Sequence, residues 1–219
     1  MFKLSLVAAT VANIHLWQIS RQEIIYNTRR CDKYMKHVGT QVIQTMRLIL
    51  RKLELADAEM MFNNWTSDNE VTRFLRWDPH KTIDDTINMI QMWIDNYQSD
   101  STYYWGIYLK DGEMIGSIGI TITSEYDYKA ELGYKIGSRW WRQGYTSEAA
   151  QAVIDYMFEN TDVERIDSYN AVNNLASSKV MGKIGMNNEG FLRHYYRIRD
   201  GFQDCTLYAI IRDEWKQTK

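Results

Sequence analysis

The chain contains few of the residues that build metal, redox or membrane-spanning sites. It has one proline, two cysteines and four histidines in 219 residues. Cys31 and Cys205 lie far apart and fit neither a metal-ligand nor a redox spacing, so a reducing compartment is the default. The histidines show no ligand spacing either, and we expect no metal site. Because no run of about 18 apolar residues occurs, the sequence predicts no membrane-spanning helix.

The composition supports a packed core. Hydrophobic residues make up 45% of the chain and aromatic residues 13%, while the charged fraction of 25% is ordinary. The length allows one large domain or one domain with an extension. Residues 46–219 contain no repeat and no low-complexity linker, and we expect them to form one α+β domain.

The formal net charge of −2 conceals two segments of opposite sign. Residues 1–45 contain six Lys or Arg and two Asp or Glu, whereas the remaining residues contain 20 and 26. We therefore separate a basic N-terminal extension, residues 1–45, from an acidic body, residues 46–219. An acidic body attracts cationic amines or basic peptides over long distances.

The extension leaves three interpretations open. Residues 1–12 include one early lysine and an apolar stretch like that of a secretory leader, although no clean small-x-small cleavage site follows. Alternatively, Met46 is the natural start, and residues 1–45 are then dispensable for activity and poorly ordered. In the third interpretation, the apolar residues of the extension form one amphipathic helix that packs on the body or on another chain.

Hydrophobic patterns along residues 46–219 predict a mixture of strands and helices. Strands are predicted at residues 47–54, 103–109, 114–123, 128–136, 163–169, 191–198 and 205–211. Helices are predicted at residues 56–65, 82–97 and 174–183, with another beginning at about residue 144. Asp111 and Gly112 between two strands indicate a hairpin, because glycine adopts a positive φ at little cost.

Residues 131–150 carry the clearest functional pattern. Leu132, Tyr134 and Ile136 predict a strand, a turn rich in Gly and Arg follows, and a helix begins at about Gly144. The unpaired N–H groups and the positive dipole end of such a helix favour an anion, typically a pyrophosphate. The loop matches neither G-x-G-x-x-G nor G-x-x-x-x-G-K-[ST], so the ligands of those motifs are not favoured.

Several blocks, in this order, resemble the GNAT acetyltransferases. Residues 141–149, WRQGYTSEA, resemble the acetyl-CoA pyrophosphate loop of that family and are most similar to its RimJ/RimL branch. Residues 174–177, NLAS, and 180–186, VMGKIGM, resemble the N-x-A-S…K-x-G-F segment. The E-G at 189–190 and the G-F-Q-D at 201–204 resemble the ending of the branch. The resemblance spans roughly residues 46–215.

Two positions depart from the family pattern. Thr146 stands where the general pattern has Gly or Ala, and a β-branched residue narrows the approach of the backbone to phosphate. Met181 stands where many members have a tyrosine that protonates the leaving thiolate, and a thioether has no proton to give.

The resemblance implies an acetyl-CoA-dependent N-acetyltransferase of the GNAT fold. That fold has a central mixed, mostly antiparallel sheet of about seven strands flanked by helices, with central strands splayed at the acetyl-CoA site. The acceptor is a primary amine, such as a protein N-terminus, a polyamine, an amino sugar or another small amine, which attacks directly in a ternary complex. We expect a cytoplasmic monomer or homodimer without a nucleic-acid or membrane partner. The alternative is a CoA-binding sensor or interaction module without turnover.

The resemblance also assigns the cofactor-binding residues. The strand that contains Leu132, Tyr134 and Ile136 offers backbone amides to the pantetheine and the thioester oxygen. The other cofactor-binding candidates are Arg139, Arg142, Gln143, Gly144, Tyr145, Thr146, Asn174 and Ser177. Asn174 is also suited to cap the helix that it precedes.

Two residues are candidates for the chemistry itself. Glu131 is the candidate base, acting directly or through a water, and its alternative is an ordinary salt-bridged strand glutamate. Ser177 is the candidate for protonating the thiolate or hydrogen-bonding the cofactor sulfur. Its alternative is a hydrogen bond to the backbone four residues back. Trp77 and Asp204 match positions on the acceptor side and are the candidate substrate-binding residues.

Overall fold

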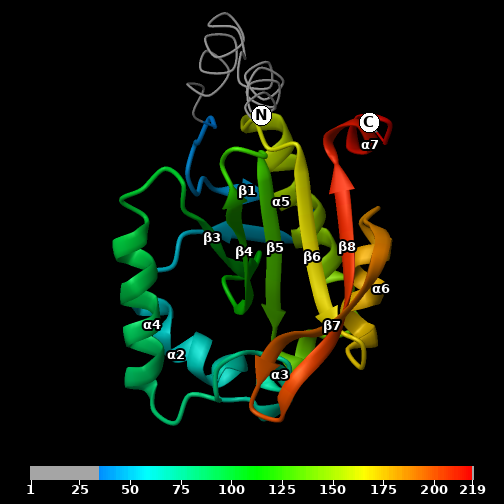
Figure 1. The fold of residues 1–219 in the computed structure, drawn as a ribbon. Coiled ribbons are helices and arrows are strands. Elements are labelled where there is room, and N and C mark those ends of the chain that lie inside the picture. The colour runs from blue at the N-terminus through cyan, green and yellow to red at the C-terminus, as the bar shows by residue number, and fades with distance from the viewer. Residues whose placement is uncertain (1–34, 219) are drawn as a thin grey trace, which may run out of the picture. The chain divides into compact units, whose positions relative to one another are not determined.

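The computed structural model describes residues 35–218, which form a single sheet with helices on both faces (Figure 1). The strands are β1 Ile43–Gln44, β2 Leu48–Arg51, β3 Tyr103–Leu109, β4 Met114–Ser124, β5 Lys129–Ile136, β6 Arg165–Ala171, β7 Asn187–Ile198 and β8 Gly201–Ile211. Their order is β1-β2-β3-β4-β5-β6-β8-β7, and every neighbouring pair is antiparallel except β5–β6. The expected α+β architecture is confirmed. The sheet has eight strands rather than about seven, because β1 adds a short pairing to β2.

Three of the described helices are longer segments, and the others are short turns. In chain order, the helices are η1 Leu55–Asp57, α2 Ala58–Met61, η2 Phe62–Thr66, α3 Asn69–Thr72, α4 Ile83–Asn96, η3 Ser138–Trp140, α5 Tyr145–Asn160, α6 Leu175–Lys183 and α7 Arg212–Lys216; the longer three are α4, α5 and α6. The helix predicted at residues 56–65 therefore occurs as consecutive 3₁₀, α and π turns. At the start of α4, the backbone N–H of Thr82 donates to the Asp85 carboxylate at 3.0 Å, which caps the first turn.

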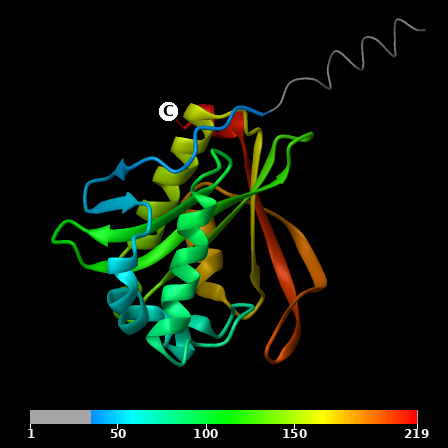
Figure 2. The same ribbon diagram turned by 90° about the vertical axis from the view of Figure 1, so that its left-hand side faces the viewer.

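The two faces of the sheet carry separate apolar clusters. On one face, the buried stripe of α5 packs against β2 to β6, with Ile154 and Met157 fully buried. On the other face lie α2 and α4, where Trp93 stacks on Tyr104 with ring centroids 3.8 Å apart. Figure 2 shows α4 on the near side of the sheet. The apolar residues at helical spacing in α5 thus form its buried side.

Residues 35–45, which the charge pattern assigned to the extension, belong to the same compact unit as the sheet. The Thr40 hydroxyl donates to the Thr102 carbonyl at 2.8 Å and accepts from the Tyr104 N–H at 3.0 Å. Residues 1–34, on which the leader and amphipathic-helix hypotheses depend, lie outside the described residues. Within residues 35–218, no helix is long and apolar enough to cross a membrane.

Both turn glycines singled out from the sequence adopt the left-handed backbone that favours glycine. Gly112, between β3 and β4, has φ +95°, and its N–H donates to the Leu109 carbonyl at 3.0 Å. Gly144 has φ +84° and is the N-cap residue of α5. The predicted hairpin and the predicted helix start are thus confirmed. In sequence, α5 follows β5 after a short loop that contains η3.

Arg212 closes the C-terminal end of α5 and gives a direct test of the packing. Its guanidinium donates to the buried carbonyls of Phe158, Thr161 and Val163 at distances between 2.5 and 3.0 Å. Arg212→Met leaves these carbonyls without donors, and we expect it to lower the free energy of unfolding by about 3 kcal/mol. Urea denaturation measures this loss, with Arg212→Lys expected to lose roughly half as much. A methionine variant as stable as wild type would contradict the role.

Candidate functional site

Strands β5 and β6 are paired only over the first three residues of each. Glu131 and Asp167 form the last pair of the described β5–β6 ladder, although β5 continues to Ile136 and β6 continues to Ala171. Beyond that pair β6 stays bonded to β8, so β5 and β6 diverge. The Ser168 hydroxyl spans the point of divergence and donates to the Leu132 carbonyl at 3.0 Å. From residue 132 onward, the backbone of β5 has no strand partner on its β6 side. Its N–H and C=O groups on that side therefore need another partner, such as a side chain or a ligand.

Helix α5 begins close to this opening. Gly144 precedes it in the left-handed region, and the N–H of Glu148 donates to the Gly144 carbonyl at 3.1 Å. The N–H groups of the first turn, which includes Tyr145 and Thr146, therefore have no acceptor within the helix. With the positive end of the helix dipole, they are suited to bind an anion, and this helix start is called the anion site below. The Thr146 side chain is half-buried in this turn.

Two cations that the sequence analysis did not assign flank this anion site. A Cβ added at Gly144 would meet Arg47 Nη2 at 3.5 Å and Lys183 Nζ at 3.8 Å. Arg47 is held in place, because its Nε donates to the Glu148 carboxylate at 2.6 Å and its Nη1 to the Gln143 carbonyl at 3.0 Å. Lys183 lies in residues 180–186, which resemble the family segment beside the cofactor, so that resemblance could have identified it. Arg47 lies on the first predicted strand and carried no such signal.

Glu148, the carboxylate that holds Arg47, has a lowered pKa and is therefore ionised. Burial alone would raise the pKa of Glu148, but hydrogen bonds from Thr45 and Arg47 outweigh it and lower the pKa. Glu148 Oε1 accepts from the Thr45 hydroxyl at 2.6 Å and from the Arg47 N–H at 2.9 Å. An ionised Glu148 therefore fixes the segment before β2 against the start of α5.

The structure brings Tyr134 and Ser177 together. The Tyr134 hydroxyl lies 2.8 Å from Ser177 Oγ and 3.2 Å from the Ser177 carbonyl, which links β5 to α6. Burial raises the pKa of Tyr134 to about 12, so the resting phenol is protonated at neutral pH. Asn174 Oδ1 accepts from the Ser177 N–H at 3.3 Å, which confirms the predicted cap of α6. Met181, one turn further on, is fully buried in the core.

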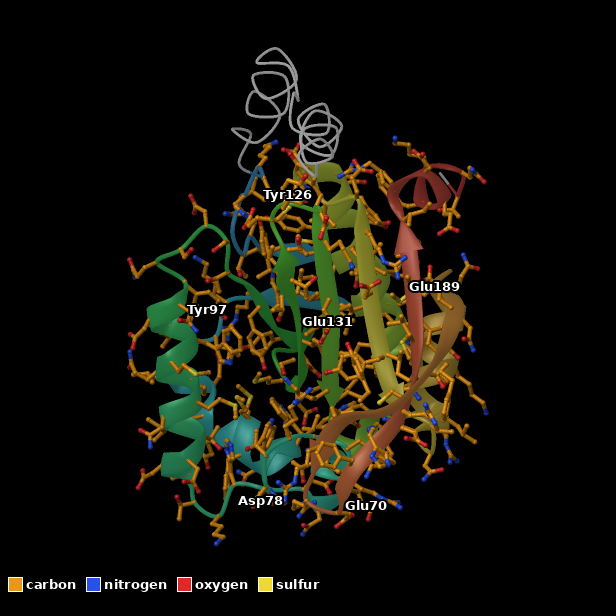
Figure 3. All side chains as sticks on the ribbon, in the orientation of Figure 1. Glu70, Asp78, Tyr97, Tyr126, Glu131 and Glu189 are labelled. Atoms are coloured by element: carbon orange, nitrogen blue, oxygen red, sulfur yellow. The ribbon has the colours of Figure 1, made fainter. Side chains whose placement is uncertain are left out.

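Glu131, labelled on β5 in Figure 3, is an odd-numbered position of that strand. Its side chain therefore lies on the opposite face of β5 from that of Tyr134, because side chains alternate along a strand. Burial raises its pKa, Arg76 opposes that rise, and the neighbouring Asp167 adds to it. A Cβ added at Gly133, two residues further on the same face, would meet nothing within 4 Å, so this face is open. A half-buried carboxyl with a raised pKa next to open space is suited to accept a proton.

The remaining predicted cofactor-binding residues contact other parts of the protein or are exposed in the loop before α5. The Arg139 guanidinium donates to Asn64 Oδ1 at 2.5 Å and to Glu113 at 3.4 Å, which anchors it to η2 and the β3–β4 turn. Arg142 is exposed in the loop with φ +62°. Gln143 is also exposed, and its backbone carbonyl accepts from Arg47. The side chains of the two β5 residues on either side of Tyr134 point into the core against α5; they are Leu132 and Ile136.

The two predicted acceptor-side residues have clear structural contacts. Trp77 packs between Trp65 and His80, with ring centroids 6.4 and 5.0 Å away. Asp204 Oδ1 accepts from the backbone N–H of His194 at 2.8 Å. Across residues 35–218, no group of three or more His, Cys, Asp or Glu side chains is placed to hold a metal ion.

The raised pKa of Glu131 predicts a pH-dependent stability. A carboxyl whose folded pKa is raised stabilises the fold while protonated, and that stability is lost as pH rises through the folded pKa. Glu131→Gln removes this titration, so its free energy of unfolding relative to wild type should increase as pH rises from about 4, the ordinary value for a glutamate, through the raised folded pKa.

Glu189→Gln is the matched control for this titration. A hydrogen bond from Arg165 lowers the pKa of Glu189, so this variant should lose stability relative to wild type as pH rises. Urea denaturation at fixed ionic strength measures both differences. Parallel trends in the two variants would contradict the assignment of a raised pKa to Glu131.

Known proteins share this fold and sequence. Residues 47–187 match the family model described as an acetyltransferase (GNAT) domain. The chain is 34% identical over 172 residues to the Bacillus subtilis (strain 168) protein named "Uncharacterized N-acetyltransferase YoaA", which covers 78% of this chain and 97% of that protein. It is also 25% identical to the ribosomal protein uS5-alanine N-acetyltransferase of Escherichia coli (strain K12), over 83% of this chain and 96% of that enzyme.

A solved structure agrees with these relatives. The crystal structure of an acetyltransferase (GNAT family) from Bacillus anthracis superposes with a TM-score of 0.71 at 28% identity, covering 79% of this chain and 99% of that one. The family model alone matches more than half of the chain. The chain therefore belongs to the GNAT family of N-acetyltransferases, whose members use acetyl-CoA as the acetyl donor.

Proposed function

We propose that this chain transfers the acetyl group of acetyl-CoA to a primary amine by direct attack in a ternary complex, as a RimJ/RimL-like enzyme. The observation that carries the proposal is the divergence of β5 and β6 directly after the Glu131–Asp167 pair. It opens the β5 backbone beside a carboxyl with a raised pKa, near the anion site of α5.

The donor side of the site is the start of α5 and the open edge of β5. The pyrophosphate of acetyl-CoA would bind the N–H groups that follow Gly144, with Arg47 and Lys183 supplying positive charge. The pantetheine arm would follow residues 132–136 toward the divergence. This assignment fits the residues present, because the side chain missing at Gly144 leaves the helix N-terminus accessible between two cations.

The acceptor must lose a proton before it can attack. Ammonium groups of this kind have a pKa of about 8 to 10, so most of the amine is protonated at neutral pH. Glu131 would take that proton, directly or through a water. The amine nitrogen then bonds to the thioester carbon, and a backbone N–H of β5 stabilises the oxyanion by roughly 3 kcal/mol.

Collapse of that intermediate breaks the carbon–sulfur bond and releases a thiolate, and the nitrogen loses its second proton to water to become the amide. Ser177 would give the sulfur a hydrogen bond or a proton. In the second case, the Tyr134 phenol 2.8 Å away would pass its own proton to Ser177 and take one back from water. The family's usual tyrosine position on α6 is filled by the buried Met181, and the phenol that contacts Ser177 belongs instead to Tyr134 on β5. Ser177 and Tyr134 together thus take the part of a general acid.

The second candidate function is CoA binding without turnover. Thr146 in the first turn of α5 and Met181 in place of a tyrosine are the residues that favour it. The acceptors to test are protein N-terminal amines, polyamines, amino sugars and other small amines. The Escherichia coli relative is named for acting on an alanine of ribosomal protein uS5, and this supports testing a protein amine first.

Gly144→Val tests the donor side. A Cβ at this point projects between the two cations, and valine also strains the left-handed backbone. We expect the dissociation constant of CoA to rise by at least about tenfold, measured by calorimetry. Gly112→Val imposes similar strain in the β3–β4 turn and should leave CoA affinity unchanged. Unchanged affinity in a folded Gly144→Val protein would remove the pyrophosphate assignment.

Glu131→Gln tests the acceptor side in steady-state kinetics. The amide keeps the shape of the carboxyl but cannot accept a proton, so kcat should fall by about 10²- to 10⁴-fold while CoA affinity is retained. The loss should shrink as pH approaches the pKa of the amine, because less of the amine then needs a base. Normal turnover of the variant at neutral pH would transfer the role of base to another group.

A further inference from the structure

The β7–β8 hairpin contains a clamped bulge. The two strands lose register between Leu192 and Tyr196, where three residues of β7 lie opposite Asp204 alone. Within the bulge, His194 has the left-handed φ of +49°, and its N–H donates to Asp204 Oδ1 at 2.8 Å. A non-glycine residue with this backbone persists only where its surroundings hold it. Bulges of this kind bend a strand and redirect a side chain, often beside an active site.

The outer half of the hairpin is fastened to the loop between α3 and α4. The Tyr196 hydroxyl donates to the Phe74 carbonyl at 3.2 Å, and Arg199 lies 3.3 Å from the carboxylate of Asp78. Figure 1 shows this half of the hairpin turning away from the line of β8 toward α3. The bend at the bulge is therefore fixed from both sides.

The bulge brings Tyr195 to the open face beside Glu131. The Tyr195 ring meets the Tyr169 ring edge to face, with centroids 4.7 Å apart at 82°. Tyr169 follows Asp167 by two residues on β6, so it lies on the same face as Asp167 and the paired Glu131. Tyr195 itself is 46% exposed, so its ring is accessible to a ligand.

The groups around this face carry charges of both signs. Burial raises the pKa of Tyr195, and the nearby Glu131 and Asp167 raise it further, which agrees with a position close to both carboxyls. Arg76 bounds the face on the other side, where its guanidinium donates to the Tyr169 hydroxyl at 3.3 Å. Arg76 therefore lies beside the same face as Glu131, Tyr169 and Tyr195.

We propose that Tyr195 contacts the acceptor, and that Asp204 is a positioning residue that holds Tyr195 there by fixing the bulge. The proposal rests on the proposed function, because it assigns the acceptor side of the same site. An electron-rich ring face beside two carboxyls binds a cation, so the acceptor arrives as a primary ammonium and is deprotonated in place. Asp204 acts through the His194 N–H, without contact to the acceptor.

The kinetic test measures acceptor KM separately from kcat and CoA affinity. The probes are an alanine-initiated peptide, spermidine and kanamycin, and the one that wild type turns over is used. Tyr195→Ala should raise acceptor KM by roughly tenfold with CoA affinity unchanged, whereas Tyr195→Phe keeps the ring and stays near wild type. An unchanged acceptor KM in a folded Tyr195→Ala protein would overturn the contact.

The positioning role has its own pair of variants. Asp204→Ala should raise acceptor KM as Tyr195→Ala does, while Asp204→Asn retains an acceptor oxygen for the His194 N–H and should stay near wild type. The double variant Asp204→Ala/Tyr195→Ala should be no worse than Tyr195→Ala, because both act through one side chain. Additive losses would show that Asp204 acts independently of Tyr195.

A second readout does not depend on turnover. Carbon-13 NMR of the Glu131 carboxyl in the free protein should show a lower pKa in Tyr195→Ala and Asp204→Ala, because both open Glu131 to water. Tyr195→Phe and Asp204→Asn should leave that pKa unchanged. If wild type turns over no probe, the proposed function fails, and the NMR titration alone decides the placement of Tyr195. An unchanged Glu131 pKa in both alanine variants overturns the inference.

Discussion

The separation of β5 from β6 is the constraint on which the rest of the site depends. These strands form the one parallel pair of the described sheet, and a parallel pair requires a crossover connection, here α5. The crossover places the N-terminus of α5 near the end of β5. The separation after Glu131 then leaves the β5 backbone accessible. The anion site, the open backbone and the carboxyl thus follow from one feature of the topology.

Alternation along β5 divides the chemistry between two faces of the sheet. Tyr134 points toward α6, where it meets Ser177, and Glu131 points to the opposite face, where it lies beside Asp167. A donor held at the start of α5 and an acceptor held near Tyr195 would therefore meet at the divergence from opposite sides. Such an arrangement lets the amine attack and the thiolate leave without competing for one group.

Local patterns predicted the elements, and long-range contacts decided what the sequence could not reveal. Gly144 and Asn174 were assigned correctly as helix starts because a turn glycine and a capping amide act on their immediate neighbours. The sequence did not indicate that Arg47 lies beside Gly144, because that position depends on a contact with Glu148, about a hundred residues away. Arg139, adjacent to the loop in sequence, is anchored by Asn64 instead. The bulge that presents Tyr195 likewise exists only in the pairing of two strands.

Thiol release from acetyl-CoA tests most directly whether the divergence of β5 and β6 supports acetyl transfer to an amine. Wild type would be assayed with N-terminal peptides, polyamines and aminoglycosides, and the acetylated amine identified by mass spectrometry. We expect thiol release that depends on one class of acceptor and matches the acetylated amine mole for mole. Silence across the panel, with tight CoA binding retained in calorimetry, would contradict the claim and identify a CoA-binding module.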